Sequence, residues 1–136
     1  MVQYSDLKNE AVATAPPGEE RQDAHYRVAP HNMEAEQGLL GALLVDNRAL
    51  EGVSDYLRPQ HFFVPAHQRI FEAITTLNER GQTANPVTLR NFFEKDNDLT
   101  QVGGADYLFD LSSSVINVIN TDDYGRTIYE LFLRRE

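Results

Sequence analysis

The chain has 136 residues, of which 41% are hydrophobic and 24% are charged, and this fits one globular domain. Its formal charge of −9, with Lys and Arg scattered along the chain, argues against tight DNA binding, because phosphate contacts need clustered cations. The sequence has no membrane-spanning apolar run, no secretory signal at its start and no cysteine, so we expect a cytoplasmic protein that is not membrane-bound.

Residues 1–30 are predicted to form a flexible N-terminal tail. They contain Pro16, Pro17 and Gly18 among small and charged residues. Such a composition buries too little apolar surface to offset the entropy that is lost on ordering. The folded body is therefore expected to begin near Pro30.

The first predicted helix follows Asn32, a suitable N-cap, and runs to about Val45. Glu34 and Glu36 lie in its first turn, where acidic side chains complement the helix dipole. Two glycines within it lower helix propensity, so we expect a packing reason for them, such as the close approach of another helix. The predicted buried face consists of Leu39, Leu40, Leu43 and Leu44.

A second, shorter helix is predicted from about Ala49 to Leu57, ending before Pro59. The segment that follows carries Phe62 and Phe63, which are both predicted to anchor in the core. The apolar face of this second helix consists of Leu50, Val53 and Leu57.

The clearest helix pattern spans Pro65 to Gly81. Pro65 fits the first turn, and Gly81 supplies a residue that tolerates positive φ just beyond the end. Asn85 and Pro86 then form the cap and the first residue of a fourth helix. The core face of the clearest helix is predicted to contain Ile70, Ile74 and Leu77.

Two further helices are predicted at the C-terminal end. The first opens at Gly103 and Gly104 and runs to about Ser113. After a polar turn, Thr121 acts as the N-cap of a final helix that continues to the chain end. Two apolar stripes run along this helix, one with Tyr124, Ile128 and Leu131 and the other with Tyr129, Phe132 and Leu133.

These elements predict an all-α fold in two parts, a globular helical head over residues 31–101 and a helical hairpin over residues 102–136 that is cut at the chain end. Leaving the second stripe in water would forgo about 5–9 kcal/mol of burial, so we expect self-association through the hairpin. The predicted interface for a second copy of the chain or another protein is Tyr124, Ile128, Tyr129, Phe132 and Leu133.

No catalytic, metal or nucleotide-binding site is predicted, because the common phosphate-loop, dinucleotide, zinc-protease and serine-hydrolase motifs do not occur. A metal site of His61, His67 and Glu72 is the weaker alternative to a partly buried His67 at a helix start. Asp122 and Asp123 are interpreted as helix-terminal acids rather than an acid/base pair. The glycine pair before the fifth helix is interpreted as a turn rather than a phosphate site.

Several segments occur together in one order along the chain. They are Pro30, AEQGLLGALL at 35–44, LRPQHFFVPAHQRIFEAITTL at 57–77, NPVTL at 85–89, VGGADYLFDL at 102–111, and Asn120 with Tyr124 and Arg135. This combination resembles the N-terminal domain of DnaB-type bacterial replicative DNA helicases, from about residue 30 to the chain end.

The resemblance implies a helical head and a hairpin, with hairpins of neighbouring subunits paired so that six domains form a collar above the ATPase ring of a hexamer. It also implies docking of the C-terminal domain of primase, with a helicase loader as a further candidate partner. ATP and Mg²⁺ would be bound by a later RecA-like domain. We therefore expect this chain to need no cofactor and to lack enzymatic activity.

The chain departs from the family pattern at three positions. Asn85 stands where Asp is common, Ile116 replaces a proline in the predicted turn, and Gly125 replaces an alanine and is expected to weaken the last helix by about 1 kcal/mol. Two other functions stay open: a free-standing helical adaptor for another replication protein, and a small helical enzyme. The sequence also leaves open whether the isolated chain is a monomer, a dimer or a hexamer.

Overall fold

The computed structural model describes residues 29–114 and 121–136, and in these ranges the chain forms helices and no strand. The predicted all-α fold class is confirmed. Contacts divide the chain into residues 1–30 and residues 31–136, and the second unit holds every helix described below. The predicted tail lies outside the described residues, apart from its last two positions.

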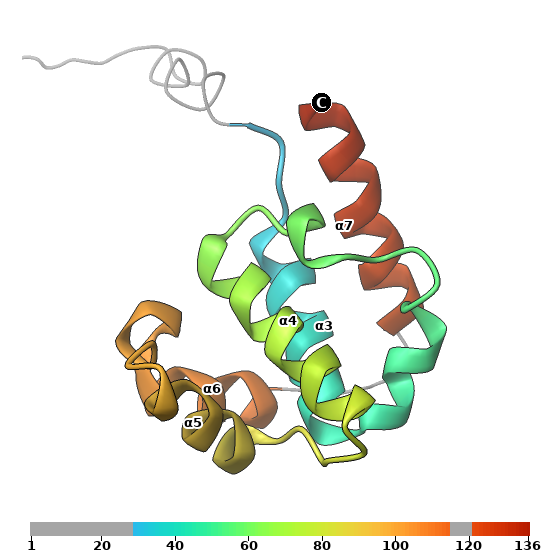
Figure 1. The fold of residues 1–136 in the computed structure, drawn as a ribbon. Coiled ribbons are helices and arrows are strands. Elements are labelled where there is room, and N and C mark those ends of the chain that lie inside the picture. The colour runs from blue at the N-terminus through green and yellow to red at the C-terminus, as the bar shows by residue number, and fades with distance from the viewer. Residues whose placement is uncertain (1–28, 115–120) are drawn as a thin grey trace, which may run out of the picture. The chain divides into compact units, whose positions relative to one another are not determined.

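Figure 1 shows the order and arrangement of the helices. The α-helices are α3 (Met33–Val45), α4 (Pro65–Glu79), α5 (Pro86–Lys95), α6 (Gly104–Ser113) and α7 (Thr121–Arg135). Short 3-10 helices lie between them: η2 (Asn47–Gly52), η3 (Pro59–His61) and η4 (Thr100–Val102).

Helix α3 is the central element, because α4, α6 and α7 all pack against it (Figure 1). Its leucines Leu39, Leu40 and Leu43 are completely buried. The close approach expected at a glycine occurs at Gly38, where an added Cβ would lie 2.7 Å from the Tyr124 ring of α7. A side chain at this position would therefore push α7 away from α3.

Hydrogen bonds at both ends of α5 and at the C-terminal end of α4 match local sequence signals. Past the end of α4, Gly81 has a φ of 74°, and the N–H of Gln82 donates to the carbonyl of Leu77 over 2.9 Å, which is a Schellman ending. Asn85 caps α5 by accepting from the N–H of Thr88 over 2.9 Å. Asn97, with a φ of 58°, provides the same kind of ending for α5.

The predicted helix from Ala49 to Leu57 is wrong in type and bounds, because the chain forms the 3-10 helix η2 over Asn47–Gly52 and then a turn. Asn47 fixes this geometry: its side-chain amide donates to the carbonyls of Leu43 and Ala84 over 2.7 and 2.8 Å. These two bonds, of which the one to Ala84 is long-range, favour a tight turn over a regular helix. The predicted apolar side chains Leu50, Val53 and Leu57 are nevertheless all buried.

Phe63 is half-buried and lies outside the core, contrary to the prediction for it. Phe62 is buried, and it has extended backbone angles, so its neighbour points to the other side of the segment. The Phe63 ring stacks on His31 with the ring centroids 4.1 Å apart. The remaining predicted core residues are buried: Leu40, Leu43, Leu44, Phe62, Ile70, Ile74 and Leu77.

The division of the body into a helical head and a C-terminal hairpin stays a prediction, because the turn predicted near 117–120 lies outside the described residues. Helices α6 and α7 each pack mainly on α3, within the unit of residues 31–136. Figure 1 shows α6 and α7 on different sides of α3. Both contribute to one core, which contains Leu108 and Leu111 of α6 and Ile128 of α7.

Candidate interaction surface on the C-terminal helix

The first half of α7 is packed into the body of the protein. Ile128 is buried in the core, so it is not part of an exposed interface as predicted. Gly125 is also buried, and an added Cβ there would lie 2.7 Å from the Tyr56 hydroxyl and 2.8 Å from a methyl group of Val53. Tyr124, half-buried, packs against Gly38. Close packing therefore explains why glycine stands at position 125.

The second half of α7 packs against aromatic side chains of the same chain. The rings of Tyr129 and Phe132 lie 5.0 and 4.6 Å from the His61 ring, measured between centroids. Tyr56 meets Tyr129 edge-on at 5.9 Å. We call these four residues the C-terminal aromatic cluster. It covers much of the stripe for which the sequence predicted an external partner.

His61 is held in a fixed orientation within this cluster. The backbone N–H of Arg58 donates to its Nδ1 over 2.9 Å, which requires an unprotonated Nδ1. Burial lowers the pKa of His61, and the nearby positive charges of Arg58 and Arg135 lower it further. The cluster therefore contains a neutral imidazole at neutral pH.

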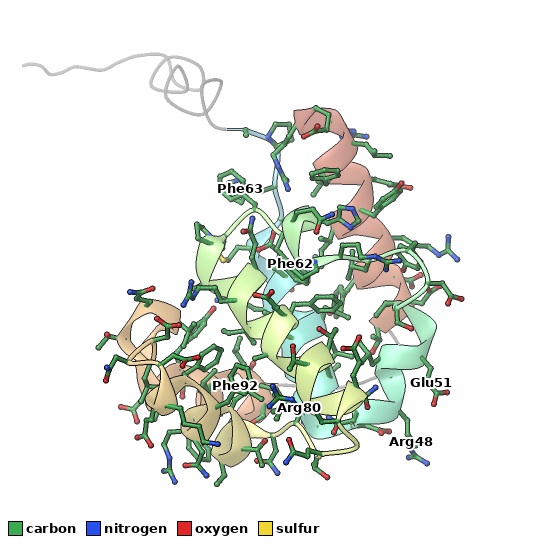
Figure 2. The ribbon with its side chains drawn as sticks, in the orientation of Figure 1. Arg48, Glu51, Phe62, Phe63, Arg80 and Phe92 are labelled. Atoms are coloured by element: carbon green, nitrogen blue, oxygen red, sulfur yellow. The ribbon has the colours of Figure 1, made fainter. Side chains whose placement is uncertain are left out.

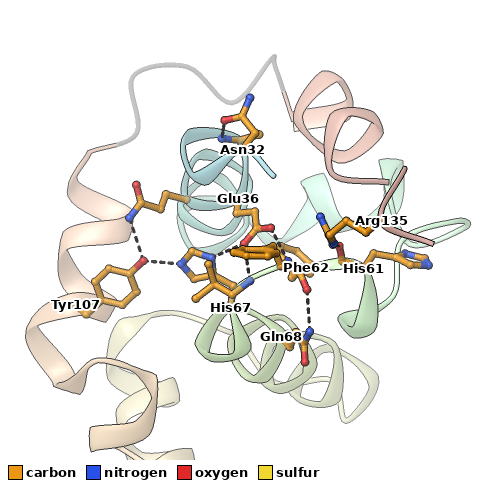
Figure 3. A network of polar contacts seen from close by, with 12 residues as sticks. Asn32, Glu36, His61, Phe62, His67, Gln68, Tyr107 and Arg135 are labelled. Atoms are coloured by element: carbon orange, nitrogen blue, oxygen red, sulfur yellow. Dashed lines mark hydrogen bonds and ion pairs between the residues drawn. The ribbon is translucent and has the colours of Figure 1, made fainter. Parts of the chain in front are cut away.

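Arg135 ties the last turn of α7 to the segment that precedes α4. Its guanidinium donates to the carbonyl of His61 over 2.8 Å, a contact shown in Figure 3. The guanidinium also lies over the Phe63 ring, 5.3 Å from its centroid, and near Phe132 at 5.9 Å. These contacts hold the last turn of α7 against the segment that contains His61 and Phe63.

The exposed remainder of the predicted interface is small. Leu133 is 51% exposed, whereas Tyr124, Tyr129 and Phe132 are half-buried. Glu130 and Arg134 flank Leu133 and are exposed. The surface offered by α7 is thus one apolar side chain within a charged rim, with aromatic edges beside it, and this pattern fits a modest contact with another protein.

A buried polar network lies behind this surface and was not predicted. Glu36 is buried, and its carboxylate accepts from the N–H groups of Phe63 and Val64 over 2.6 and 3.3 Å (Figure 3). Val64, the N-cap position of α4, makes no side-chain cap of its own. Glu36 therefore supplies from α3 the hydrogen-bond acceptor that the start of α4 lacks.

The network continues through His67 to α6. His67 is fully buried rather than partly buried as predicted, with Nδ1 2.7 Å from Glu36 Oε1 and Nε2 2.6 Å from the Tyr107 hydroxyl. Gln37 donates to the same hydroxyl over 3.1 Å. Every one of these groups has a partner, so the network links α3, α4 and α6 and presents no free acid or base for catalysis.

Asp122 and the glycine pair before α6 both have structural roles. Asp122 accepts from Arg126 Nε over 3.0 Å and lies 3.1 Å from the Tyr56 hydroxyl, and the hydrogen bond from Arg126 lowers its pKa. Burial, together with Asp122, raises the pKa of Tyr56 to about 12. The N–H groups of Gly103 and Gly104 donate to backbone carbonyls, so neither is available to a phosphate.

The described part of the chain offers neither a metal site nor a membrane-spanning helix. In residues 29–114 and 121–136, no group of three or more His, Cys, Asp or Glu side chains is placed to hold a metal ion. Each helix in the same ranges is too short or too polar to cross a membrane.

Comparison with known proteins gives one consistent family. Residues 28–130 match the family described as "DnaB-like helicase N terminal domain". The replicative DNA helicase DnaB of Rickettsia conorii is 48% identical over 109 residues, which cover 80% of this chain and 22% of that protein. The chain thus spans about a fifth of the length of this relative.

Solved structures give the same result for the fold. The N-terminal domain of DnaB helicase from Mycobacterium tuberculosis is 36% identical, with a TM-score of 0.76 over 79% of this chain and 78% of that one. A second structure, described as "The Structure Of A DnaB-Like Replicative Helicase And Its Interactions With Primase", is 28% identical, with a TM-score of 0.68 over 76% of this chain and 24% of that one.

Proposed function

Because this chain belongs to the family of DnaB-like helicase N-terminal domains, we propose that it is the assembly and primase-docking domain of a hexameric replicative DNA helicase. The observation that carries the proposal is the match to the Mycobacterium tuberculosis domain, which covers most of both chains at a TM-score of 0.76. The likeness to a helicase that was solved for its interactions with primase supports primase as the partner.

The features of α7 support a docking role for its exposed end. Leu133 is 51% exposed beside the half-buried edges of Tyr129 and Phe132, and the charged residues around it give a polar rim. The C-terminal aromatic cluster holds the rings of Tyr129 and Phe132 in place before any partner binds. A surface arranged in advance loses less conformational entropy on association.

ATP and Mg²⁺ belong to a separate part of the parent protein in this proposal. The chain has no phosphate loop, and it corresponds to 22% of the Rickettsia conorii helicase. The full protein would hydrolyse ATP in its remaining portion, in the cytoplasm, while residues 31–136 contribute assembly and docking. A fluorescent ATP analogue is expected not to bind this chain, and saturable binding would contradict the assignment.

Primase docking is tested by calorimetric titration of the chain with the C-terminal domain of primase from the same organism. We expect saturable binding that Leu133→Asp weakens at least tenfold. Val45→Asp is the matched control, since Val45 is 56% exposed at the end of α3. An absence of binding, or equal effects of the two substitutions, would contradict docking on α7.

Self-association is tested separately by sedimentation velocity over a range of concentrations. We expect a concentration-dependent dimer that Leu133→Asp shifts toward the monomer. Val87→Asp is the control here, because Val87 is 44% exposed on α5. A wild-type chain that stays monomeric at the highest concentration would show that assembly needs more of the parent protein than this chain.

A further inference from the structure

A second surface lies between the C-terminal end of α4 and the outer face of α5. A hollow of about 240 Å³ is lined there by Leu77, Arg80, Gln82, Asn91, Phe92 and Lys95, together with two threonines. We call it the α4–α5 groove. Arg80 and Phe92, labelled in Figure 2, lie close together at this place. None of its lining residues belongs to α7 or to the C-terminal aromatic cluster.

Local geometry places these side chains on one surface. The Schellman ending of α4 turns the chain sharply after Arg80, so Gln82 comes back beside the end of the helix. On α5, Asn91 and Lys95 are four residues apart and share a helical face, and Phe92 lies next to them. Leu77 is buried and forms the apolar floor.

The charge of the α4–α5 groove is opposite to that of the whole protein. The chain has a formal charge of −9, yet the lining of this groove contains two cations and no carboxylate. Two other hollows differ: one is lined by Glu34 and Asp123, and another by three glutamates, Glu51, Glu72 and Glu79, and one cation, Arg58. Glu79 thus faces a different side of α4 from Arg80.

The polar groups of the groove are available to a ligand. Within the described residues, neither Arg80 nor Lys95 forms an ion pair, and the side-chain amides of Gln82 and Asn91 make no hydrogen bond. The Arg80 guanidinium lies 5.9 Å from the centroid of the Phe92 ring, a contact that leaves its N–H groups able to donate to carboxylate partners. Phe92 itself is half-buried and offers an apolar contact.

We propose that the α4–α5 groove binds a short, extended acidic segment of another protein. Arg80 and Lys95 would pair with carboxylates, the amides of Gln82 and Asn91 would bond to the peptide backbone, and Phe92 would contact an apolar side chain. The volume of about 240 Å³ lies below the roughly 300–1,000 Å³ of small-molecule pockets. A cofactor is therefore a poorer fit than a peptide that crosses the surface.

Single-stranded nucleic acid fits these observations less well. Nucleic acid is negatively charged, as an acidic peptide is, and its bases would stack on Phe92. Its affinity, however, depends on a row of protein cations along the phosphate backbone. The groove supplies two, and the formal charge of −9 repels a polyanion over a wider area than it repels a short peptide.

The proposal is tested by NMR titration of the full chain with a synthetic peptide that alternates Glu and Leu. A peptide with Gln in place of Glu is the matched probe without charge. We expect saturable shift changes at Arg80, Gln82, Asn91 and Lys95 with the acidic peptide alone. Raising the salt from about 0.1 M to about 1 M, which shortens the screening length from about 10 Å to about 3 Å, should weaken binding.

Charge-reversal variants localise the effect. Arg80→Glu with Lys95→Glu is expected to weaken peptide binding at least tenfold, and Arg48→Glu, which changes an exposed arginine on η2, should leave it unchanged. Circular dichroism would verify that both variants are folded. The NMR shift changes of the wild-type chain test the site of binding without any variant. Shift changes outside the groove, equal binding of the uncharged peptide, or binding of oligothymidine alone would overturn the proposal.

Discussion

The two halves of α7 are attached to the body of the protein in different ways. The first half is packed against α3 and η2 through the buried residues Gly125 and Ile128, and an added Cβ at Gly125 would meet Tyr56 and Val53. The second half is held by half-buried rings and by the hydrogen bond from Arg135 to His61. Ile128 of the first half is therefore part of the core, whereas we expect substitutions in the second half to leave the domain folded.

Replacing Ile128 by alanine is expected to have the largest effect. Ile128 is buried in the shared core, so the substitution should reduce the free energy of unfolding by about 2–5 kcal/mol through lost burial and a residual cavity. Urea denaturation measures this change. Leu133→Ala, on the same helix but 51% exposed, is the control and should change it by less than about 0.5 kcal/mol. Similar losses for both would mean that α7 is not docked as described.

Gly125→Ala separates helix propensity from packing. Alanine should add about 1 kcal/mol to helix stability, but its Cβ would lie 2.8 Å from a methyl group of fully buried Val53, and such overpacking costs about 1–3 kcal/mol. We expect a net loss of about 1 kcal/mol in urea denaturation.

A second substitution separates the effect of helix propensity from the effect of overpacking at position 125. In a Val53→Ala background the methyl contact is removed while the contact with the Tyr56 hydroxyl remains, so Gly125→Ala should cost less stability than it does with Val53 intact. If Gly125→Ala stabilises the protein with Val53 intact, the close approach of α7 to η2 is looser than the structure shows.

The sequence predicted those parts of the fold that depend on neighbouring residues. The cap at Asn85 and the positive φ at Gly81 are local, and both occur where they were expected. The leucine stripe of α3 was also predictable from its spacing. Contacts between residues far apart in the sequence were not predictable, because the two apolar stripes on α7 are equally compatible with a hairpin, a dimer or the core of its own domain.

The buried polar network shows the same limit of sequence-based prediction for a single residue. The sequence placed Glu36 only as an acid in the first turn of its own helix, since nothing nearby in sequence shows that it caps α4. One signal was present: Val64 precedes Pro65 at a helix start and has no side-chain acceptor. A missing local cap before a clear helix indicates that a distant residue supplies one.

Phe132→Ala is expected to have a smaller effect than the substitutions in the first half. The ring is half-buried, and it contacts His61 at 4.6 Å and the Arg135 guanidinium at 5.9 Å. Losing these contacts should cost about 1–2 kcal/mol in urea denaturation, without loss of the helical circular dichroism signal. A loss as large as that of Ile128→Ala would remove the distinction between the two halves.

The pH dependence of stability gives the smallest and most specific test of the C-terminal aromatic cluster. Burial holds the pKa of His61 below the usual value of 6.5, so the unfolded chain binds a proton more readily than the folded one. Its contribution to stability is fully present above about pH 6.5 and is lost as the pH falls from there through the lower folded-state pKa. His61→Asn keeps an acceptor for the Arg58 N–H but does not titrate. The wild type should therefore lose more stability than this variant between about pH 7 and about pH 5, as measured by urea midpoints, and parallel curves would show that the imidazole is not buried against α7.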